Sequence, residues 1–260
     1  MRKKLSIEEI KKLDPYQLMA ALGKKVIHPG GKKSTEELIE MASLKPHHDV
    51  LEIGCGVGTT CIDLAKRFGC SITITDIDQN MIEAAKKNVS TAGLDEKIKV
   101  QQADIQQLPF SDNFFDVIII EAVTMFVNRE KAISEVMRVC KPNGKVIEHE
   151  FIWRKKPTKE ARRIFEGEVC PGIKFDTPEN WINIYSDAGL KNTNVVTGPF
   201  HMMSFSGFIS DEGLFNTFLI VLKAMSRIAF IQKTMWLMPR IMKVKNSLGY
   251  VVFSGIKSEN

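Results

Sequence analysis

The stretch Asp49-Val-Leu-Glu-Ile-Gly-Cys-Gly-Val-Gly58 decides the fold. A short apolar run ends there in glycines at three alternate positions, and positions 59–68 then have the apolar spacing of a helix. Glycines let the backbone turn sharply and approach a ligand closely, and the first turn of a helix offers free N–H groups. The stretch therefore predicts a nucleotide-like ligand at a junction of strand, loop and helix.

Strand and helix patterns alternate from this stretch onward. The predicted strands cover positions 50–53, 71–75, 97–101, 115–120, 145–152, 192–197 and 250–256, and the predicted helices between them cover 59–68, 78–91, 129–139, 159–167 and 178–188. Alternation at this spacing predicts an α/β fold. We expect a seven-stranded, mostly parallel sheet with helices on both faces.

Helical patterns also flank the sheet. Two short helices precede it, and Ser34 followed by Glu37 predicts a capping box that opens a third helix reaching about Leu44. Roughly fifty residues separate the last two predicted strands, and their helical spacing indicates an insertion rather than an independent domain. We divide the chain into an N-terminal helical cap (1–45), the ligand-binding sheet domain (46–200), the helical insertion (201–248) and a last strand of the same sheet (249–260).

Composition narrows the class of protein. The hydrophobic fraction of 44% and the charged fraction of 26% are typical of a soluble globular chain. The five cysteines form neither a Cys-x-x-Cys pair nor a zinc-like spacing, so we expect a reducing cytoplasm and no metal site. The charged start lacks the apolar core of a secretory leader, and no uninterrupted apolar run approaches the roughly 18–20 residues of a spanning helix.

Basic residues are unevenly placed. From Gly213 to Ser258 the chain has no Asp or Glu, but it has seven Lys or Arg residues. Such asymmetry is typical of a solvated basic face, and it also suits an anionic membrane surface or another anionic partner.

The spacing of the glycines narrows the ligand. A dinucleotide site needs Gly-x-Gly-x-x-Gly, but the sixth position is Thr59 when counted from Gly54 and Cys61 when counted from Gly56. An acid, Asp76, ends the second predicted strand, 22 positions after Gly54 and within reach of the loop across one βαβ step. This pattern disfavours NAD, so a nicotinamide-dependent oxidoreductase is only a third hypothesis.

Positions 50–152 resemble the class I S-adenosylmethionine-dependent methyltransferases, in particular their small-molecule, methyltransferase type 11-like branch. The matching segments are the glycine loop, Ile74-Thr75-Asp76-Ile77-Asp78, Ala103-Asp104-Ile105, Leu108-Pro109-Phe110 and Val139-Cys140-Lys141-Pro142-Asn143-Gly144. Asn143 replaces a glycine of the family, and Asn tolerates a left-handed backbone. The resemblance implies a Rossmann-like doubly wound fold, a lid of N-terminal helices that could bring Tyr16 and His28 over the cofactor, and S-adenosyl-L-methionine as that cofactor, with S-adenosyl-L-homocysteine as the product.

The resemblance also implies which residues bind the cofactor. Asp76 would accept from the ribose hydroxyls and Asp104 from the adenine amino group. Ile77 and Ile105 would wall the adenine, and Glu121 would line the methionine half. The full implied set is Glu52, Gly54, Gly56, Gly58, Asp76, Ile77, Met81, Ala103, Asp104, Ile105 and Glu121. Simpler alternatives stay open: a helix cap for Asp76, a turn residue for Asp104, core packing for the isoleucines and a solvated helix start for Glu121.

Methyl transfer is an in-line displacement at a sulfonium carbon, so positioning in a dry pocket can contribute roughly 7–11 kcal/mol. A general base is needed only for a protonated acceptor, and it must lie at the carboxyl ends of the strands. That condition selects Glu150, His149 and His28 as catalytic candidates, followed by Glu121 and His201. Strand alternation puts Glu148 and Glu150 on one face and His149 on the other. His28 can equally be a simple turn residue.

The acceptor is less well determined. After the fourth strand the chain has Glu121-Ala-Val-Thr124 in place of the Asn/Asp-Pro-Pro-Tyr that grips an amine in many methyltransferases of nucleic-acid bases or glutamine. The Leu-Pro-Phe stretch resembles enzymes acting on quinones, sterols and other small metabolites. We therefore expect a small, lipophilic acceptor walled by the insertion, in a cytoplasmic protein whose basic flank contacts the inner membrane surface. A solvated lid is the alternative to membrane contact. An RNA-binding methyltransferase or a non-catalytic RNA-binding domain is the second hypothesis, although we expect no nucleic-acid partner, and the oligomeric state is open.

Overall fold

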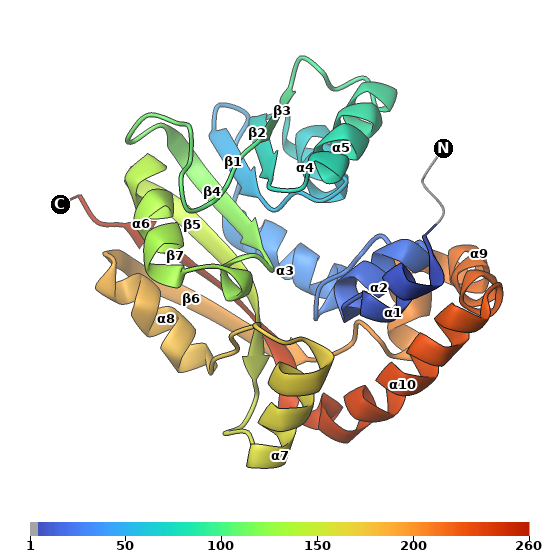
Figure 1. The fold of residues 1–260 in the computed structure, drawn as a ribbon. Coiled ribbons are helices and arrows are strands. Elements are labelled where there is room, and N and C mark those ends of the chain that lie inside the picture. Colours follow the sequence, from blue (N-terminus) through green and yellow to red (C-terminus); the bar gives the residue numbers. More distant parts are fainter. Residues whose placement is uncertain (1–4, 260) are drawn as a thin grey trace.

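One mixed sheet forms the centre of the protein (Figure 1). The computed structural model describes residues 5–259, so residues 1–4 of the predicted N-terminal cap, and residue 260, lie outside the described part. Within that part the strands are β1 (Asp49–Ile53), β2 (Ser71–Asp76), β3 (Ile98–Gln102), β4 (Phe115–Glu121), β5 (Cys140–Trp153), β6 (Leu190–Pro199) and β7 (Leu248–Lys257). Their order is β3-β2-β1-β4-β5-β7-β6, and β7 runs antiparallel to both of its neighbours, β5 and β6. The predicted seven-stranded, mostly parallel sheet is confirmed.

Helices cover both faces of the sheet. The helical elements are α1 (Ile7–Lys12), α2 (Pro15–Leu22), α3 (Gly31–Ala42), α4 (Thr59–Phe68), α5 (Gln79–Thr91), η1 (Thr124–Phe126), α6 (Arg129–Val139), α7 (Lys159–Arg162), η2 (Arg163–Val169), α8 (Pro178–Asp187), α9 (Phe205–Met225), α10 (Ile228–Val244) and η3 (Lys245–Ser247). One apolar cluster joins α3, α4 and α5 to one face. The other cluster joins α6 and α8 to the opposite face and continues into α2 and α10.

The apolar run of β4 explains its central position. Val117 and Ile119 face the first cluster, whereas Ile118 and Ile120 face the second, and all four are at most 2% exposed. A strand buried on both faces suits the middle of a parallel sheet. The strand order reverses between β1 and β4, and the crevice at the carboxyl ends of the strands at such a reversal is where open α/β sheets bind ligands.

The start of α3 differs from the prediction. The helix begins at Gly31, so Ser34 lies inside it and donates to the Gly31 carbonyl at 2.9 Å instead of forming a capping box. The Lys32 N–H in the first turn donates to the Asp211 carboxylate of α9 at 3.0 Å. The capping group comes from far along the chain, so the local pattern could not reveal it.

Asp211 also belongs to a buried ion cluster that fastens α9 to the loop between α2 and α3. Lys24 lies 2.8 Å from Asp211 and 3.8 Å from Glu212, and these three side chains are at most 3% exposed. Glu212 accepts from the N–H groups of Lys25 and Val26 at 2.8 and 3.0 Å. The cluster therefore fixes the position of α9 over the N-terminal segment.

By length and composition, α9 could cross a membrane: its mean hydropathy is 1.2 and 28% of the apolar window is buried. Asp211 and Glu212 interrupt the run, and Gly213 breaks the helix with φ 76° and ψ 164°. Because both acids are paired inside the protein, we interpret α9 as a helix packed on the fold. Ile220 of α9 and Phe230 of α10 lie in the same apolar cluster as the sheet residue Phe151. The division of the chain into four segments stays a prediction.

The ion cluster yields a stability prediction. Lys24→Met should lower the free energy of unfolding by about 3–5 kcal/mol, because it leaves two buried carboxylates without their counter-charge. Chemical denaturation would measure the loss. Lys11→Met is the matched control: Lys11 pairs with Glu8 on the surface, where ion pairs contribute little, so the unfolding midpoint should hardly move. Similar stability of the two variants would contradict the assigned role of the cluster.

Candidate active site

The glycine loop has the backbone that a close-binding cradle requires. Gly54, Gly56 and Gly58 have φ of 78°, 53° and 80°, a region that other residues rarely adopt. A Cβ on Gly54 would lie 2.1 Å from Val123, whereas a Cβ on Gly56 would meet no described atom within 4 Å. Gly58 is the N-cap of α4 and has no side chain to cap the helix, so first-turn N–H groups of α4 are left without a side-chain cap beside the glycine loop.

Asp76 links the end of β2 to this loop. Its carboxylate accepts from the Gly56 N–H and from the Asp78 N–H, both at 2.9 Å. Burial raises the pKa of Asp76, and these two backbone donors oppose the rise. The helix-cap alternative does not hold, because Asp78 caps α5 by accepting from the Asn80 N–H at 2.8 Å.

The two isoleucines implied for the adenine wall differ in environment. Ile77 is 65% exposed although it directly follows Asp76, so an apolar surface is free beside the loop. Ile105 is 4% exposed and packs in the core, which is the simpler alternative for that residue. Met81 is half-buried in the first turn of α5.

Asp104 lies in the turn after β3. Its carboxylate accepts from the Gln106 N–H at 2.8 Å, so a turn role is present in this structure. Half-buried Ala103 donates its N–H to the Asp76 carbonyl at 3.1 Å, which places the exit of β3 beside the exit of β2. Adenine binding by Asp104 stays a prediction.

Glu52 of β1 carries a buried polar atom without a partner. Its side chain lies among the strands at 2% exposure, and among residues 5–259 its Oε2 has no hydrogen-bond partner. Burial, followed by the negative charges of Glu121 and Asp76, raises the pKa of Glu52 well above its usual value. An orphan polar atom beneath a glycine loop indicates that a ligand or water completes the site.

Glu121, at the end of β4, brings two predicted catalytic histidines together. Its Oε1 lies 3.4 Å from His28 Nε2 and 3.4 Å from His149 Nδ1. It also accepts from Thr35 of α3 at 3.1 Å and, through Oε2, from Thr60 of α4 at 3.3 Å. The solvated alternative for Glu121 is wrong, because its side chain is only 10% exposed.

The charges in this cluster follow from burial and proximity. Burial lowers the pKa of His28 to about 4, although the Glu121 carboxylate opposes this shift. Burial works against ionisation of Glu121 as well, but the proximity of His28 and His149 and the Thr35 hydrogen bond hold its pKa at about 2. At neutral pH the cluster therefore contains a carboxylate anion beside a neutral His28.

Glu150, the first catalytic candidate, supports the backbone. Its Oε1 accepts from the N–H groups of Val123, Thr124 and Met125 at 3.1, 2.6 and 3.3 Å, and so holds η1 in place. Glu148 shares its face, as predicted from strand alternation, and accepts from the Tyr185 hydroxyl. Burial raises the pKa of both glutamates. A general-base role for Glu150, His149 or His28 stays a prediction.

Two other lid residues occupy different positions. His201 is exposed, and its N–H donates to the Pro29 carbonyl at 2.8 Å, so its backbone ties the start of α9 to the His28 loop. The Tyr16 hydroxyl lies 3.9 Å from the Met125 sulfur, and its ring meets Phe126 and Phe151 edge-on. Tyr16 therefore packs against apolar and aromatic side chains of β5 and η1.

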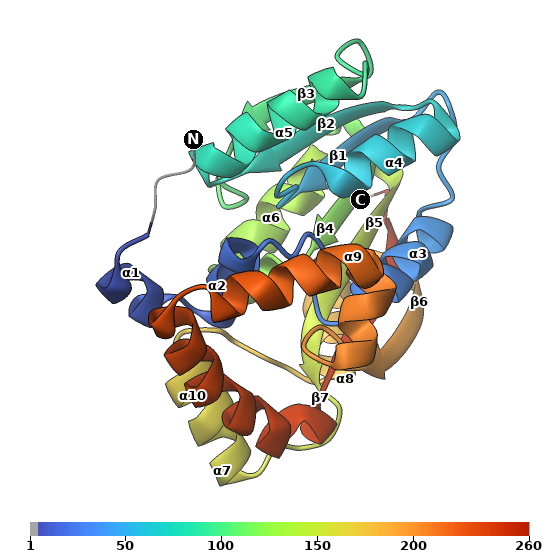
Figure 2. The same cartoon turned by 90° about the vertical axis from the view of Figure 1, so that its right-hand side faces the viewer.

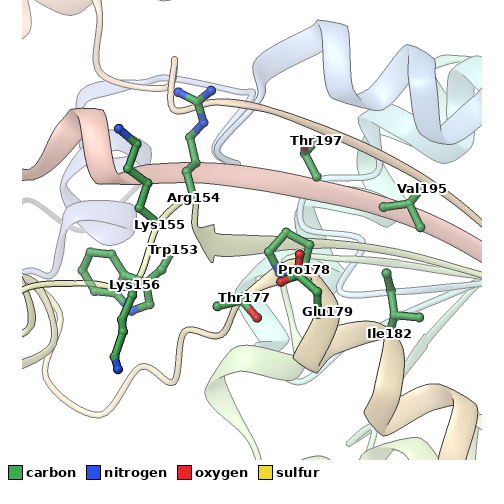
Figure 3. A pocket seen from close by; sticks show the side chains of 10 residues that line it. All are labelled: Trp153, Arg154, Lys155, Lys156, Thr177, Pro178, Glu179, Ile182, Val195 and Thr197. Atoms are coloured by element: carbon green, nitrogen blue, oxygen red, sulfur yellow. The ribbon is translucent and has the colours of Figure 1, made fainter.

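A hollow of about 590 Å³ lies away from the glycine loop, at the end of β5 (Figure 3). Its walls come from Trp153 to Lys156, the start of α8 and the outer strand β6. None of the predicted site residues lines it. It is open and basic, in contrast to the buried cluster around Glu121.

Sequence reasoning missed Thr35 and Thr60, which bind the two oxygens of Glu121. Thr60 is the second residue of α4, and a hydroxyl in the first turn after a glycine loop was a usable signal. Thr35 had no comparable signal, because its approach depends on how α3 packs against β5.

Comparison with known proteins decides the family. The model of a methyltransferase domain matches residues 51–147. An uncharacterised protein of Haemophilus influenzae is 37% identical over 81% of this chain and 85% of its own length. The methyltransferase GfsG of Streptomyces halstedii is 30% identical over 62% of this chain and 59% of its own length. The chain belongs to the class I S-adenosylmethionine-dependent methyltransferases.

Solved structures of low identity show the same fold. A phosphoethanolamine N-methyltransferase of Haemonchus contortus, in complex with S-adenosyl-L-methionine, has a TM-score of 0.75 at 18% identity and covers 99% of this chain and 59% of its own. The [4+2]-cyclase SpnF has a TM-score of 0.73 at 18% identity and covers 98% of this chain and 97% of its own. Since one fold hosts both reactions, the reaction of this methyltransferase depends on its site.

The residues of this methyltransferase fit its cofactor, S-adenosyl-L-methionine. The open space over Gly56, the orphan oxygen of Glu52 and the exposed face of Ile77 all adjoin the glycine loop or the acid that binds it. When bound, the cofactor supplies a methyl group on a sulfonium. The chain offers the Asp76 and Glu52 carboxyl groups as hydrogen-bond partners, the first-turn N–H groups of α4 as donors and the side chain of Ile77 as an apolar wall, and these groups would hold and orient it.

The role of Asp76 can be tested by calorimetry. Asp76→Asn should weaken binding of S-adenosyl-L-homocysteine by about 10- to 100-fold, because hydrogen bonds to a charged acceptor contribute roughly 1.5–3 kcal/mol. Asp78→Ala, two residues away, removes the α5 cap and should lower stability while affinity changes little. Equal losses of affinity in the two variants would show that loop order, not the Asp76 carboxylate, controls binding.

Proposed function

We propose that this methyltransferase acts on a small, lipophilic acceptor, and that positioning is its main catalytic contribution. The observation that carries the proposal is the apolar surface of α9 and α10. Large side chains are 58–74% exposed there, namely Phe205, Leu214, Phe215, Phe218, Met225, Ile228 and Met235. In Figure 2 these two helices form the outer layer over α2 and α7. Contiguous exposed apolar surface is typical of a site that meets lipid or a lipophilic ligand.

The names of relatives support the same acceptor class. UbiE of Cupriavidus taiwanensis, a ubiquinone/menaquinone biosynthesis C-methyltransferase, is 31% identical over 52% of this chain and 56% of its own length. The sterol 4-C-methyltransferase strm-1 of Caenorhabditis elegans is 34% identical over 44% of this chain and 34% of its own length. Both names describe action on apolar ring compounds.

Apolar contacts join α2 to the sheet at this end of β4 and β5. Tyr16 of α2 contacts Met125 and Phe151, and the side chains of Met125 and Phe151 are fully buried. A dry pocket that aligns the acceptor with the methyl carbon requires no side chain to take part in bonding. We therefore assign the surrounding residues to positioning and to the exclusion of water.

An untargeted methylation assay tests the acceptor class. Protein incubated with S-adenosyl-L-methionine and a lipid extract should yield products heavier by one methylene group, found by mass spectrometry. Asp76→Asn supplies the matched control, because it should reduce product formation without changing the extract. Products only in a polar extract would overturn the lipophilic acceptor.

We further propose a cytoplasmic protein that lies at the inner membrane surface through α9 and α10. Their exposed apolar residues would enter the interface, and exposed Lys223 and Lys243 would meet anionic head groups. Each basic residue near such a surface contributes about 1 kcal/mol. The kink at Gly213 and the paired acids before it favour a helix lying on the membrane over one crossing it.

Liposome flotation tests this contact. The protein should rise with vesicles containing phosphatidylglycerol and stay in the lower fraction with phosphatidylcholine alone. A variant with Leu214→Ser, Phe215→Ser and Phe218→Ser should remain below, because each buried apolar side chain contributes roughly 1.5–3 kcal/mol. Phe114→Ser is the control, because Phe114 is 48% exposed but directly precedes the first residue of β4 and belongs to neither α9 nor α10. Equal flotation of the triple variant and the wild type would reject the contact.

A further inference from the structure

Three side chains of metal-ligating type meet at the carboxyl end of β4, where Glu121 pairs with His149 of β5. His28 comes from the loop between α2 and α3, Glu121 from the last position of β4 and His149 from β5. One ligand atom of each lies within 4.8 Å of the others. Two histidines and one carboxylate form a ligand set that binds Zn²⁺ in enzymes that keep a fourth position open.

Two of the three separations between ligand atoms suit a tetrahedral ion. Ligand atoms about 2.0–2.1 Å from a tetrahedral Zn²⁺ lie roughly 3.3–3.4 Å from one another. Glu121 Oε1 lies 3.4 Å from His28 Nε2 and 3.4 Å from His149 Nδ1. Both distances are too long for good hydrogen bonds, and both are the edge lengths that a shared ion would impose.

The two ring nitrogens of His149 give the strongest indication that this cluster binds an ion. Its side chain is fully buried, and among residues 5–259 neither ring nitrogen has a hydrogen-bond partner. Its ring meets His28 and Tyr250 edge-on, at centroid distances of 5.0 and 5.7 Å. A buried polar group without a partner lowers the free energy of unfolding by about 1–3 kcal/mol, so an imidazole without a bound ion would destabilise the fold here.

The hydrogen bonds of His28 leave a lone pair directed at Glu121. Ser34 Oγ donates to the Gly31 carbonyl at 2.9 Å, so it is left to accept from His28 Nδ1 at 3.3 Å. That bond puts the proton on Nδ1 and leaves Nε2 unprotonated. Metal-binding histidines commonly donate their other ring N–H in this manner, which fixes tautomer and ring orientation.

Hydrogen bonds alone, without a metal ion, account less well for the contacts among Thr35, His28 and Glu121. Thr35 Oγ1 lies 3.1 Å from both His28 Nε2 and Glu121 Oε1, but it has a single proton to give. When that proton goes to Glu121, the lone pair of His28 faces the same carboxylate oxygen with no proton between them. A cation between the two acceptors removes this conflict and gives His149 a partner as well.

We propose that His28, Glu121 and His149 bind one divalent transition-metal ion, with Zn²⁺ preferred. His28 Nε2, a Glu121 oxygen and His149 Nδ1 supply three tetrahedral positions, and the fourth is available to water or an acceptor atom. Thr60 connects Glu121 to the first turn of α4, so the ion lies beside the glycine loop. The site does not depend on the identity of the acceptor.

Metal content tests the proposal directly. Tag-free protein is stripped with a chelator, loaded with Zn²⁺ or Co²⁺, desalted and analysed by elemental mass spectrometry. One retained equivalent is expected, and bound Co²⁺ should show the intense visible absorption of tetrahedral coordination. Retention well below one equivalent of every ion tried, or a Co²⁺ spectrum typical of six-coordination, overturns the proposal.

Variants locate the ion. His149→Ala and Glu121→Gln should lose the retained metal, and Ser34→Ala should weaken affinity by about 10- to 100-fold through the orientation of His28. The double variant His47→Ala, His48→Ala is the matched control, because exposed His47 and half-buried His48 form a neighbouring pair outside the cluster that could bind metal adventitiously. Loss of metal in the control with retention in His149→Ala overturns the assignment.

Two further measurements distinguish loss of the ion from loss of folding and from loss of cofactor binding. Circular dichroism shows which variants fold, and if His149→Ala does not, Glu121→Gln and the wild-type Co²⁺ spectrum decide. Binding of S-adenosyl-L-homocysteine is measured on the same samples. Bound metal without cofactor binding would count against the methyltransferase function and leave the ion site intact.

Discussion

The buried carboxylate of Glu121 constrains the whole site. An anion with 10% of its side chain exposed is costly unless the surroundings compensate it. Thr35 in α3 and Thr60 in α4 donate hydrogen bonds to it, and His28 in the loop before α3 and His149 in β5 each place a ring nitrogen 3.4 Å from it. One carboxylate therefore contacts four segments that lie far apart in the sequence.

The parallel sheet explains why these segments can meet. β1 and β4 are neighbours with the order of strands reversing between them, so the connections after them diverge and leave a crevice. The glycine loop after β1 fills one side of it, and Gly54 can pass Val123 only because it has no Cβ. Asp76, from the next strand, then fastens the loop through the Gly56 N–H.

Local patterns in the sequence predicted most strands of the sheet and the part of the site that lies on the glycine loop and the strand ends. Strand ends and the glycine loop depend on neighbours along the chain, so β1, β2, β4 and the positive φ of Asn143 could be predicted. Features that depend on distant segments could not. The predicted helix at 159–167 divides into α7 and the π-helical η2, whose residues Ile164 and Phe165 pack in the core.

The same limit applies to individual site residues. The position of Glu150 near a strand end suggested a base, but it binds three N–H groups, those of Val123 and of the first two residues of η1. The ligand set around Glu121 combines positions 28, 121 and 149, a spacing that corresponds to no local metal motif. Such a set is visible only when the loop before α3 has been placed over the sheet.

The Lys24 cluster connects α9 with the segment that carries His28. Asp211 and Glu212 are the only acids buried in an otherwise apolar α9, and they bind Lys24 and the N–H groups of the segment that carries His28. Outward movement of α9 would break these contacts and release the His28 loop at the same time. Because a broken buried ion pair costs several kcal/mol, opening requires a compensating interaction. Under the membrane contact proposed above, the exposed apolar face of α9 and α10 would provide it by entering a lipid surface, and opening toward a lipophilic acceptor would accompany that contact.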